Sequence, residues 1–436
     1  MSFKNNLTKT KGYILIKGGK VYDPFLKINE KLDILIKNGI IEKINKNIPE
    51  KSSYNIFSCN NEIITNGFVD LHAHFRDPGY EDKETIETGA NSAFNGGYTR
   101  VCLMPNTNPV IDTPELVRNT INKSINLPVH IYPIGAITKQ QKGSELAEIG
   151  QMYNEGAIAI SDDGIPVKNS QILRMALEYS KKFKIPVINH AEDNCLVNKG
   201  IVNEGQISLK MGLQGNPDIS ESTMVFRDLS IAEYVSGRIH VPHVSTEKSV
   251  NLIKEFLDKG VNITSEVTPH HLCLTDSIIE SYDNNAKVAP PIRSERDRIA
   301  LINGVKSGVI NCIATDHAPH TIEDKEKDIH HAPCGMIGLE SAFGLVNKVL
   351  NHEKMSIYSI IDLFTINPAT IFNIKVNSIQ EGVQAELNII NPDHKWIFTK
   401  ESIHSKSKNS PVLGMELLGK VVATFNKGYS SYNKQN

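Results

Sequence analysis

The sequence predicts an α/β fold in which a (β/α)8 barrel carries a small β-sandwich domain built from both ends of the chain. Three observations support this prediction. The 436 residues are enough for one barrel of about 250 residues and a small second domain. Apolar stretches rich in β-branched residues alternate with segments of helical length through the middle of the chain, as in parallel β-α units. Short strands and turns replace this alternation at both ends.

The β-sandwich domain is predicted from four segments, two near each end of the chain. Short apolar runs alternate with turns in residues 13–24, 31–44, 381–392 and 417–430. Lys17-Gly18-Gly19 and Lys37-Asn38-Gly39 are each typical of a hairpin turn. We therefore expect one composite domain of residues 1–64 plus 378–436, with the barrel formed by residues 65–377.

Eight apolar stretches are expected to form the barrel strands, and eight is the number of β-α units that closes this type of barrel. Two of the segments between them show a helical pattern. Residues 170–183 repeat apolar side chains three and four positions apart, and residues 246–260 open on a threonine cap and close on glycine. The eight stretches are residues 67–74, 99–106, 129–136, 157–164, 185–192, 239–246, 262–271 and 310–320.

Composition and charge exclude several classes of function. Hydrophobic residues make up 40% of the chain and charged residues 22%, which is typical of a globular protein. Lys and Arg total 47 against 49 Asp and Glu, so we expect no basic surface for nucleic acid. The sequence contains neither the apolar core of a signal peptide nor an apolar run of about 18 residues. We expect a cytoplasmic protein with no nucleic-acid or membrane partner.

Polar and ionisable residues gather where the predicted strands end. In a (β/α)8 barrel the C-terminal strand ends meet at one mouth, and this mouth carries the active site. Four histidines and acidic residues at one mouth predict a metal site, and imidazole nitrogen with carboxylate oxygen suits zinc. The residues at these ends are His72, His74, Asn106, Asp162, Asp163, His190, His243, Asp316 and His320.

These ligands are too many for one four-coordinate ion, so we expect two metal positions. His72 and His74 stand two residues apart on one strand, so their side chains share a face and can bind the same ion. A binuclear site lowers the pKa of bound water to about 7 and polarises a carbonyl group, which indicates hydrolysis or its reverse. The first set is His72, His74 and Asp316, the second is His190 and His243, and a carboxylate of residues 161–164 can bridge them.

Eight motifs, in order and over essentially the whole chain, resemble those of the type I dihydroorotases of the amidohydrolase superfamily. The resemblance implies a metal-dependent cyclic amidohydrolase that interconverts N-carbamoyl-L-aspartate and L-dihydroorotate in de novo pyrimidine synthesis. The motifs are "DLHAHFRDPG", "ETIETGANSAFNGGYT", "MPNTNPV", "SDDG", "HAED", "HVST", "PHHL" and "IATDHAPH".

The resemblance also implies roles for the ligand residues. It gives His72, His74 and Asp316 to one zinc ion and the two remaining histidines, His190 and His243, to the other. Asp163 matches the bridging position that hydantoinase-like relatives give to a carboxylated lysine, and Asp162 is the fallback. Asp316 is expected to serve as both a metal ligand and the catalytic acid and base.

Further residues are expected to bind the substrate, which carries a carboxylate. Arg76 can form a bidentate pair with that group, and the alternative for Arg76 is a surface ion pair with Asp77 or Glu81. His270 and His271 match family positions, and we expect them to form structural hydrogen bonds. The substrate contacts implied by the resemblance are His74, Arg76, Asn106, His320, Cys334 and Gly335.

The chain departs from the family pattern at Ala289, where many members have an asparagine that contacts substrate. Two rival functions are considered. Another cyclic amidohydrolase, such as an allantoinase or a hydantoinase, would normally supply a bridging lysine where this chain has "SDDG". A dihydroorotase-like subunit that only scaffolds aspartate transcarbamoylase would typically lack the metal ligands. Expected partners are the small-molecule substrate, further copies of the chain in a homo-oligomer, and optionally aspartate transcarbamoylase.

Overall fold

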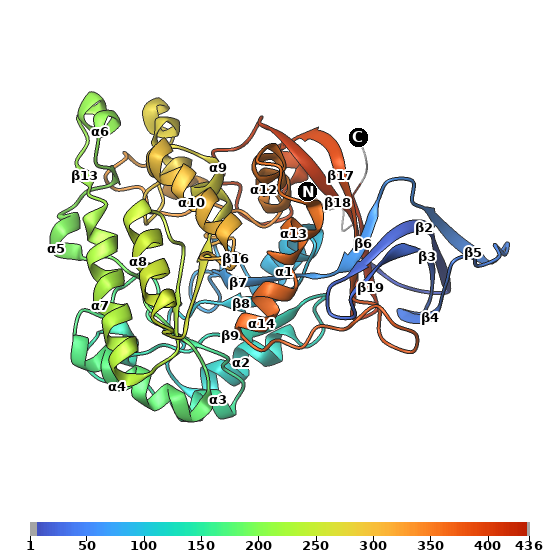
Figure 1. Cartoon of the computed structure of the whole chain (residues 1–436), viewed down its shortest axis with the longest axis horizontal. Coiled ribbons are helices and arrows are strands. Elements are labelled where there is room, and N and C mark those ends of the chain that lie inside the picture. The colour runs from blue at the N-terminus through green and yellow to red at the C-terminus, as the bar shows by residue number, and fades with distance from the viewer. Residues whose placement is uncertain (1–6, 434–436) are drawn as a thin grey trace.

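The computed structural model describes residues 7–433 of the chain. A barrel surrounded by helices occupies one side of the molecule, and a β-rich domain made from both chain ends occupies the other (Figure 1). The predicted fold class is therefore confirmed. No helix among the described residues is both long and apolar enough to cross a membrane.

The barrel contains eight parallel strands within the described chain. Strands β7 to β9 form one parallel group and the other five form a second. Isolated bridges from Gly135 to Ile160 and from Ala73 to His317 join the two groups and close the barrel. Each predicted stretch overlaps one of these strands, which are β7 (Phe68–Ala73), β8 (Tyr98–Leu103), β9 (His130–Pro133), β10 (Ile160–Ser161), β11 (Val187–Ile188), β14 (Ile239–Val241), β15 (Ile263–Val267) and β16 (Cys312–Ile313).

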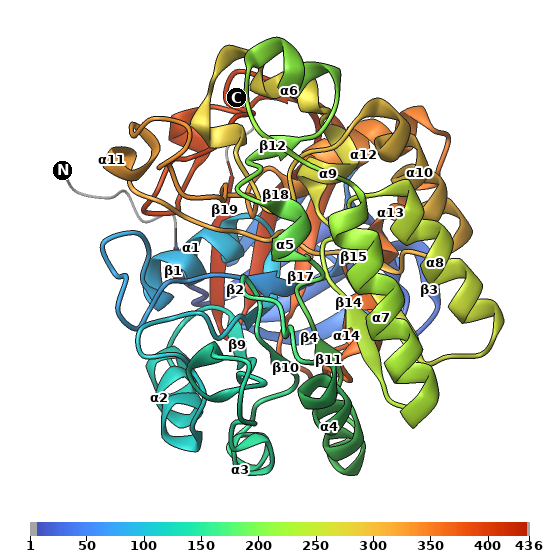
Figure 2. The same ribbon diagram turned by 90° about the vertical axis from the view of Figure 1, so that its left-hand side faces the viewer.

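Helix α8 begins and ends where the sequence provides caps. The Thr246 hydroxyl accepts a hydrogen bond from the Ser249 amide at the start of α8, and the chain turns at Gly260 with φ +81°. Figure 2 shows α2, α3, α4, α7, α8 and α10 arranged around the strands. The longer helices are α1 (Ile86–Asn95), α2 (Pro114–Ser124), α4 (Ser170–Ser180), α7 (Ile219–Val235), α8 (Glu247–Asp258), α10 (Glu295–Ser307) and α12 (Ala342–His352).

Short elements fill the connections between these helices and strands. Two short strands, β12 (Val202–Asn203) and β13 (Gly215–Asn216), pair with each other outside the barrel. The short helices are α3 (Ile149–Asn154), α5 (Asn194–Val197), α6 (Gln206–Met211), α9 (Pro269–Cys273), α11 (Ile322–Lys325), α13 (Ile357–Asp362) and α14 (Ile366–Ile371). Single 3-10 turns are η1 (Lys139–Gln141), η2 (Lys181–Phe183), η3 (Asp276–Ser281), η4 (Asn284–Ala286) and η5 (Lys400–Ser402).

The largest buried cluster lies between the strands and their covering helices. It joins strand residues such as Val187, Ile239 and Ile263 to helix residues such as Leu229 and Ile253, all of them buried. Interiors packed in this way resist deformation. The strand ends at the mouth are therefore held on a rigid support.

The β-rich domain is one sheet that contains strands from both ends of the chain. Within residues 7–433 it has nine strands in the order β1-β19-β18-β17-β6-β2-β3-β4, with β5 paired to β2. Ile16, Ile64 and Leu387 share its buried core. The exact division at residues 64 and 378 stays a prediction. The strands are β1 (Thr8–Lys9), β2 (Tyr13–Asp23), β3 (Ile28–Lys37), β4 (Ile40–Asn45), β5 (Tyr54–Ser58), β6 (Ile63–Asn66), β17 (Leu387–Ile397), β18 (Glu416–Asn426) and β19 (Tyr429–Tyr432).

One of the two predicted N-terminal hairpin turns is wrong. Asn38 and Gly39 have φ +50° and +84° and connect β3 to β4, as a tight hairpin requires. At Gly18, in contrast, β2 continues and only shifts its register against β3 between Ile16 and Gly19. Gly18 has φ +77°, so the glycine produces a β-bulge inside one strand and not a reversal of the chain.

Candidate metal centre and active site

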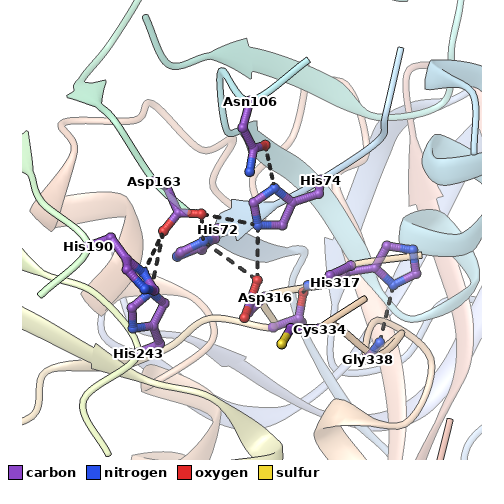
Figure 3. Close-up of polar contacts among 12 residues, drawn as sticks. His72, His74, Asn106, Asp163, His190, His243, Asp316, His317, Cys334 and Gly338 are labelled. Carbon is purple, nitrogen blue, oxygen red and sulfur yellow. Dashed lines mark hydrogen bonds and ion pairs between the residues drawn. The ribbon is translucent and has the colours of Figure 1, made fainter. Parts of the chain in front are cut away.

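The first predicted ligand group meets at the C-terminal end of β7. His74 Nε2 lies 3.0 Å from Asp316 Oδ1 and 3.5 Å from Asp163 Oδ2. His72 Nε2 lies 3.5 Å from the same Asp163 oxygen and 3.7 Å from Asp316 Oδ1. Figure 3 shows these side chains pointing toward one another. Atoms of His72, His74 and Asp163 lie close enough together to hold one metal ion.

The second group lies beside the first, where residues follow β11 and β14. His243 Nε2 is 3.3 Å from Asp163 Oδ1, and His190 Nδ1 is 3.6 Å from that oxygen. The two histidine nitrogens are 3.0 Å apart. Asp163, His190 and His243 therefore make another set that could hold an ion.

Asp163 belongs to both groups and turns a different oxygen to each. Oδ2 faces the histidines of β7, whereas Oδ1 faces His190 and His243. Asp162, the fallback, accepts hydrogen bonds from the backbone amides of Ile137 and Thr138 at 2.8 and 3.0 Å and from the Thr138 hydroxyl. The Asp162 carboxylate is thus occupied by hydrogen bonds to the segment that follows β9.

In both His72 and His74, the outer ring nitrogen, Nδ1, forms a hydrogen bond, so Nε2 points toward the ligand groups. His72 Nδ1 donates to Glu266 Oε1 at 2.7 Å, and His74 Nδ1 donates to Asn106 Oδ1 at 2.8 Å. His72 Nε2 is buried and, among the residues that the structure describes, has no hydrogen-bond partner. A buried imidazole whose outer nitrogen is held by a carboxylate is the usual arrangement of a metal ligand. The donor set therefore fits a divalent metal ion.

Glu266 and Asp70 support the site and were not found from the sequence. Glu266 lies on β15, and its other oxygen is 3.1 Å from His240 Nε2. Asp70 accepts hydrogen bonds from the Thr315 amide at 3.0 Å and from the His72 amide at 3.3 Å, which ties β7 to the residues before Asp316. Their one signal in the sequence is an acidic residue inside a predicted barrel strand.

Histidine neighbours lower the pKa of three acidic residues of the site, Glu266, Asp163 and Asp316. Burial alone would raise the pKa of Glu266, but His72 and His240 lower that pKa to about 2. Burial likewise opposes ionisation of Asp163 and Asp316, yet the adjacent histidines hold the pKa of both carboxyl groups well below the usual range. Carboxylates that are charged at neutral pH are the form that binds a cation.

Three predicted site residues have a left-handed backbone. The φ angles are +61° at Arg76, +31° at His243 and +46° at Asp316. Such a conformation costs about 1–3 kcal/mol at a non-glycine residue and concentrates at functional sites. The surrounding packing must therefore hold these three side chains in their orientations.

Arg76 points toward the loop that follows β16. Its Nε donates to the Pro319 carbonyl at 3.2 Å, and one terminal nitrogen lies 3.3 Å from His320 Nε2. Asp77, the partner in the alternative interpretation, pairs instead with Lys123 at 2.5 Å. Arg76 and His320 thus lie side by side near Asp316, at the mouth of the barrel.

The segment that contains Cys334 and Gly335 lies against His320. His320 Nε2 is 2.8 Å from the Cys334 carbonyl oxygen. Gly335 has φ +133°, and a Cβ placed there would lie 3.0 Å from His320 Nε2 and 2.8 Å from Ala318 Cβ. Only glycine allows this close approach without displacement of the neighbours.

Two buried lysines tie down the loop that precedes Cys334. Lys325 donates to the carbonyls of Asn284 and Pro333 at 3.0 and 2.8 Å. Lys287 donates to the carbonyls of Ile329 and Ala332 at 2.7 and 2.6 Å. Burial and the charge of Lys287 lower the pKa of Lys325, to about 8. The loop is therefore anchored through its backbone at both ends.

The two histidines of "PHHL" lie outside the ligand groups. His271 Nδ1 is 2.8 Å from the Thr268 hydroxyl, and its Nε2 is 2.9 Å from the Pro290 carbonyl. These bonds support the segment that begins at Ala289, as expected of a structural residue. His270 is buried, and its Nε2 has no hydrogen-bond partner in the described part of the chain.

Comparison with known proteins gives a consistent result. Residues 61–249 match a family model described as "Dihydro-orotase-like". A curated dihydroorotase from Acetivibrio thermocellus is 43% identical over 95% of this chain and 98% of its own length. One from Trichlorobacter lovleyi is 39% identical over 94% of this chain and 97% of its own length.

Solved structures show the same fold at lower identity. The L-hydantoinase (dihydropyrimidinase) of Arthrobacter aurescens superposes with a TM-score of 0.84 at 24% identity, over 98% of this chain and 96% of that chain. A dihydropyrimidinase from Brevibacillus agri NCHU1002 gives a TM-score of 0.82 at 18% identity, over 97% of this chain and 96% of that chain. At this identity the likeness establishes the fold alone.

Proposed function

Because this chain belongs to the dihydroorotase family, we propose that it catalyses the reversible, zinc-dependent cyclisation of N-carbamoyl-L-aspartate to L-dihydroorotate in de novo pyrimidine (UMP) biosynthesis. The observation that carries the proposal is Asp163, which turns one oxygen to each of two histidine pairs. The nearly full-length likeness to curated dihydroorotases supports the same reaction. The chain is accordingly an enzyme that hydrolyses cyclic amides.

We assign one or two zinc ions to the two ligand groups. His72, His74 and Asp316 would hold one ion, His190 and His243 the other, and Asp163 would bridge them. When bound, zinc lowers the pKa of water and polarises a carbonyl oxygen. The protein's contribution is to hold the imidazoles of His72 and His74 in place through Glu266 and Asn106.

Asp316 is assigned the proton transfers. In the hydrolytic direction its carboxylate accepts the proton of the attacking water and delivers it to the departing ring nitrogen. In the biosynthetic direction it removes a proton from the carbamoyl nitrogen, which then attacks the side-chain carboxyl carbon with loss of water. Asp316 Oδ1 lies 3.0 Å from His74 Nε2, so the carboxylate stands beside the proposed ligand nitrogens.

The substrate carboxylate is assigned to the cluster around Arg76. The guanidinium supplies parallel N–H donors and His320 lies 3.3 Å away, so both can face one anionic group. Asn106 and His74, the next two proposed contacts, are hydrogen-bonded to each other. The polar backbone of Cys334 and Gly335 completes the proposed set of substrate contacts.

Partners and location belong to the same proposal. We assign the small-molecule substrate as the principal partner and a homo-oligomer as the active assembly. Binding to aspartate transcarbamoylase is a further association to be tested. The cytoplasm is the expected compartment. Size-exclusion chromatography with light scattering, with and without that transcarbamoylase, tests both associations.

A substrate panel tests the reaction directly. Purified protein would be assayed with dihydroorotate, allantoin and hydantoin while its metal content is measured in the same sample. We expect turnover of dihydroorotate to exceed that of the other two by more than about 100-fold, because a site built for a carboxylate rejects analogues without one. Preferential turnover of hydantoin or allantoin would favour the rival amidohydrolases. Metal-free, folded protein without turnover would favour the scaffold subunit.

A further inference from the structure

Asn409 lies outside the barrel sequence but reaches two of the proposed substrate-contacting segments. It belongs to the irregular chain between η5 and β18, and its side chain is buried, with 5% of its surface exposed. Oδ1 accepts a hydrogen bond from the His320 amide at 3.0 Å. Nδ2 donates to the carbonyls of Ala318 and Gly335 at 3.1 and 3.2 Å. One amide group therefore connects residues 318–320 to residue 335.

The backbone of Asn409 strengthens this connection. Its carbonyl accepts a hydrogen bond from the Ile337 amide at 3.0 Å. On the other side of the same segment, the Gly335 amide donates to the Lys287 carbonyl at 2.9 Å. Gly335 is thus held between Lys287 and Asn409, at the point where it approaches His320.

The chain before Asn409 is anchored to the loop that carries Arg76. The Ser405 hydroxyl and the Lys406 amide donate to the buried carboxylate of Glu84, the latter at 3.1 Å. The Ser407 hydroxyl donates to the Lys83 carbonyl at 2.7 Å. Lys83 and Glu84 follow Arg76 in the connection from β7 to α1. Residues 405–409 therefore contact the segments that carry Arg76, His320 and Gly335.

We propose that Asn409 is a positioning residue that sets the spacing between His320 and the Cys334–Gly335 backbone, and with it the affinity for the substrate carboxylate. This inference rests on the proposed function. Asparagine suits the role because its amide accepts and donates at once, as the His320 amide and the two carbonyls require. An aspartate there would set a carboxylate oxygen against two carbonyl oxygens, and alanine would leave all three groups unpaired.

The test compares Asn409→Ala with a matched variant, Asn347→Ala. Asn347 is also buried, and its Nδ2 also donates to two carbonyls, those of Pro392 and Leu418, each at 2.9 Å. It joins α12 to the β-rich domain and contacts none of the proposed substrate residues. Both variants lose packing and buried hydrogen bonds, three in Asn409→Ala and two in Asn347→Ala. Only Asn409→Ala loses contacts to the proposed substrate-binding segments.

We expect Asn409→Ala to raise the KM for dihydroorotate at least about tenfold, with a smaller change in kcat and unchanged metal content, because displacement of a substrate-orienting group weakens binding. Asn347→Ala should lower Tm comparably and leave KM unchanged. If Asn409→Ala does not fold, Asn409→Ser, which replaces the amide with one hydroxyl that can still donate and accept, should raise KM in the same direction by a smaller factor.

An unchanged KM in folded Asn409→Ala or Asn409→Ser, with active wild-type enzyme, would overturn the positioning role and leave the proposed function intact. Equal rises of KM in the Asn409 and Asn347 variants would overturn it as well, because the effect would then be general destabilisation. Wild-type protein that binds metal but does not turn over dihydroorotate would overturn the proposed function, and this inference with it.

Discussion

Asp162 and Asp163 are adjacent in the sequence, but the fold gives them different surroundings. The motif alone left both as candidate bridges between the ions. The backbone amides of Ile137 and Thr138 occupy the Asp162 carboxylate, whereas Asp163 faces four histidines. The family resemblance favoured Asp163, but spacing alone could not separate the two residues, because the contacts of Asp162 come from the segment that follows β9. Asp163 as a metal bridge remains a proposal that substitution can test.

Asp163→Asn should lose most of its bound zinc and lower kcat by more than about 100-fold, because the bridging charge is removed while the shape of the side chain is retained. Asp162→Asn is the matched control, since its amide oxygen can still accept both backbone hydrogen bonds. Metal analysis and steady-state kinetics on both variants make the comparison. Equal metal content in the two would contradict the assignment of Asp163.

Glu266→Gln should weaken zinc affinity by about 10–100-fold and leave the barrel folded, because the group that orients His72 loses its charge. Glu221→Gln is the control. Glu221 is also a buried carboxylate, and it accepts hydrogen bonds from the amides of Ser245 and Thr246 at 3.1 and 3.2 Å. Competition with a chelator measures the affinities, and equal affinities in both variants would refute the role of Glu266.

At the scale of elements, the eight strands could be predicted from the sequence because apolar β-branched stretches alternate with helical ones. The residues at which the strands end could not be predicted, because several strands pair over only two residues before polar residues follow, as at Ile160–Ser161. The hairpin turn predicted at Lys17-Gly18-Gly19 is wrong for a related reason. A glycine with positive φ serves a bulge as well as a hairpin, and only the partner strand decides between them.

The loop before Cys334 is the element whose rigidity affects the site most directly. Lys287→Met removes the donor to Ile329 and Ala332 and keeps the length of the side chain. Hydrogen exchange across residues 326–335 should become faster, and the KM for dihydroorotate should rise while metal content stays constant. Lys306→Met, which removes an exposed ion pair with Glu353, should change neither. Unaltered exchange in Lys287→Met would show that the lysine does not anchor the loop.

In the whole molecule, the two chain ends form the β-rich domain, and residues 405–409 of the C-terminal part also contact the mouth of the barrel. The composite sheet could be predicted because turns and short strands recur at both ends. The contribution of residues 405–409 to the mouth of the barrel could not be predicted. Their sequence, within "SKSKNS", shows neither strand nor helix periodicity, and Asn409 is one polar residue among several. The contacts of Asn409 with His320 and Gly335 join residues far apart in the sequence, so they could be seen only in the folded chain.

Turnover of dihydroorotate by this chain should depend on metal held by the two histidine groups. The most direct test measures dihydroorotate hydrolysis and metal content together, before chelation, after exhaustive chelation, and after zinc is restored. We expect the activity to fall to less than about one hundredth when the metal is removed and to return when zinc is added, while the protein stays folded. Full activity in protein verified to contain no metal would contradict it.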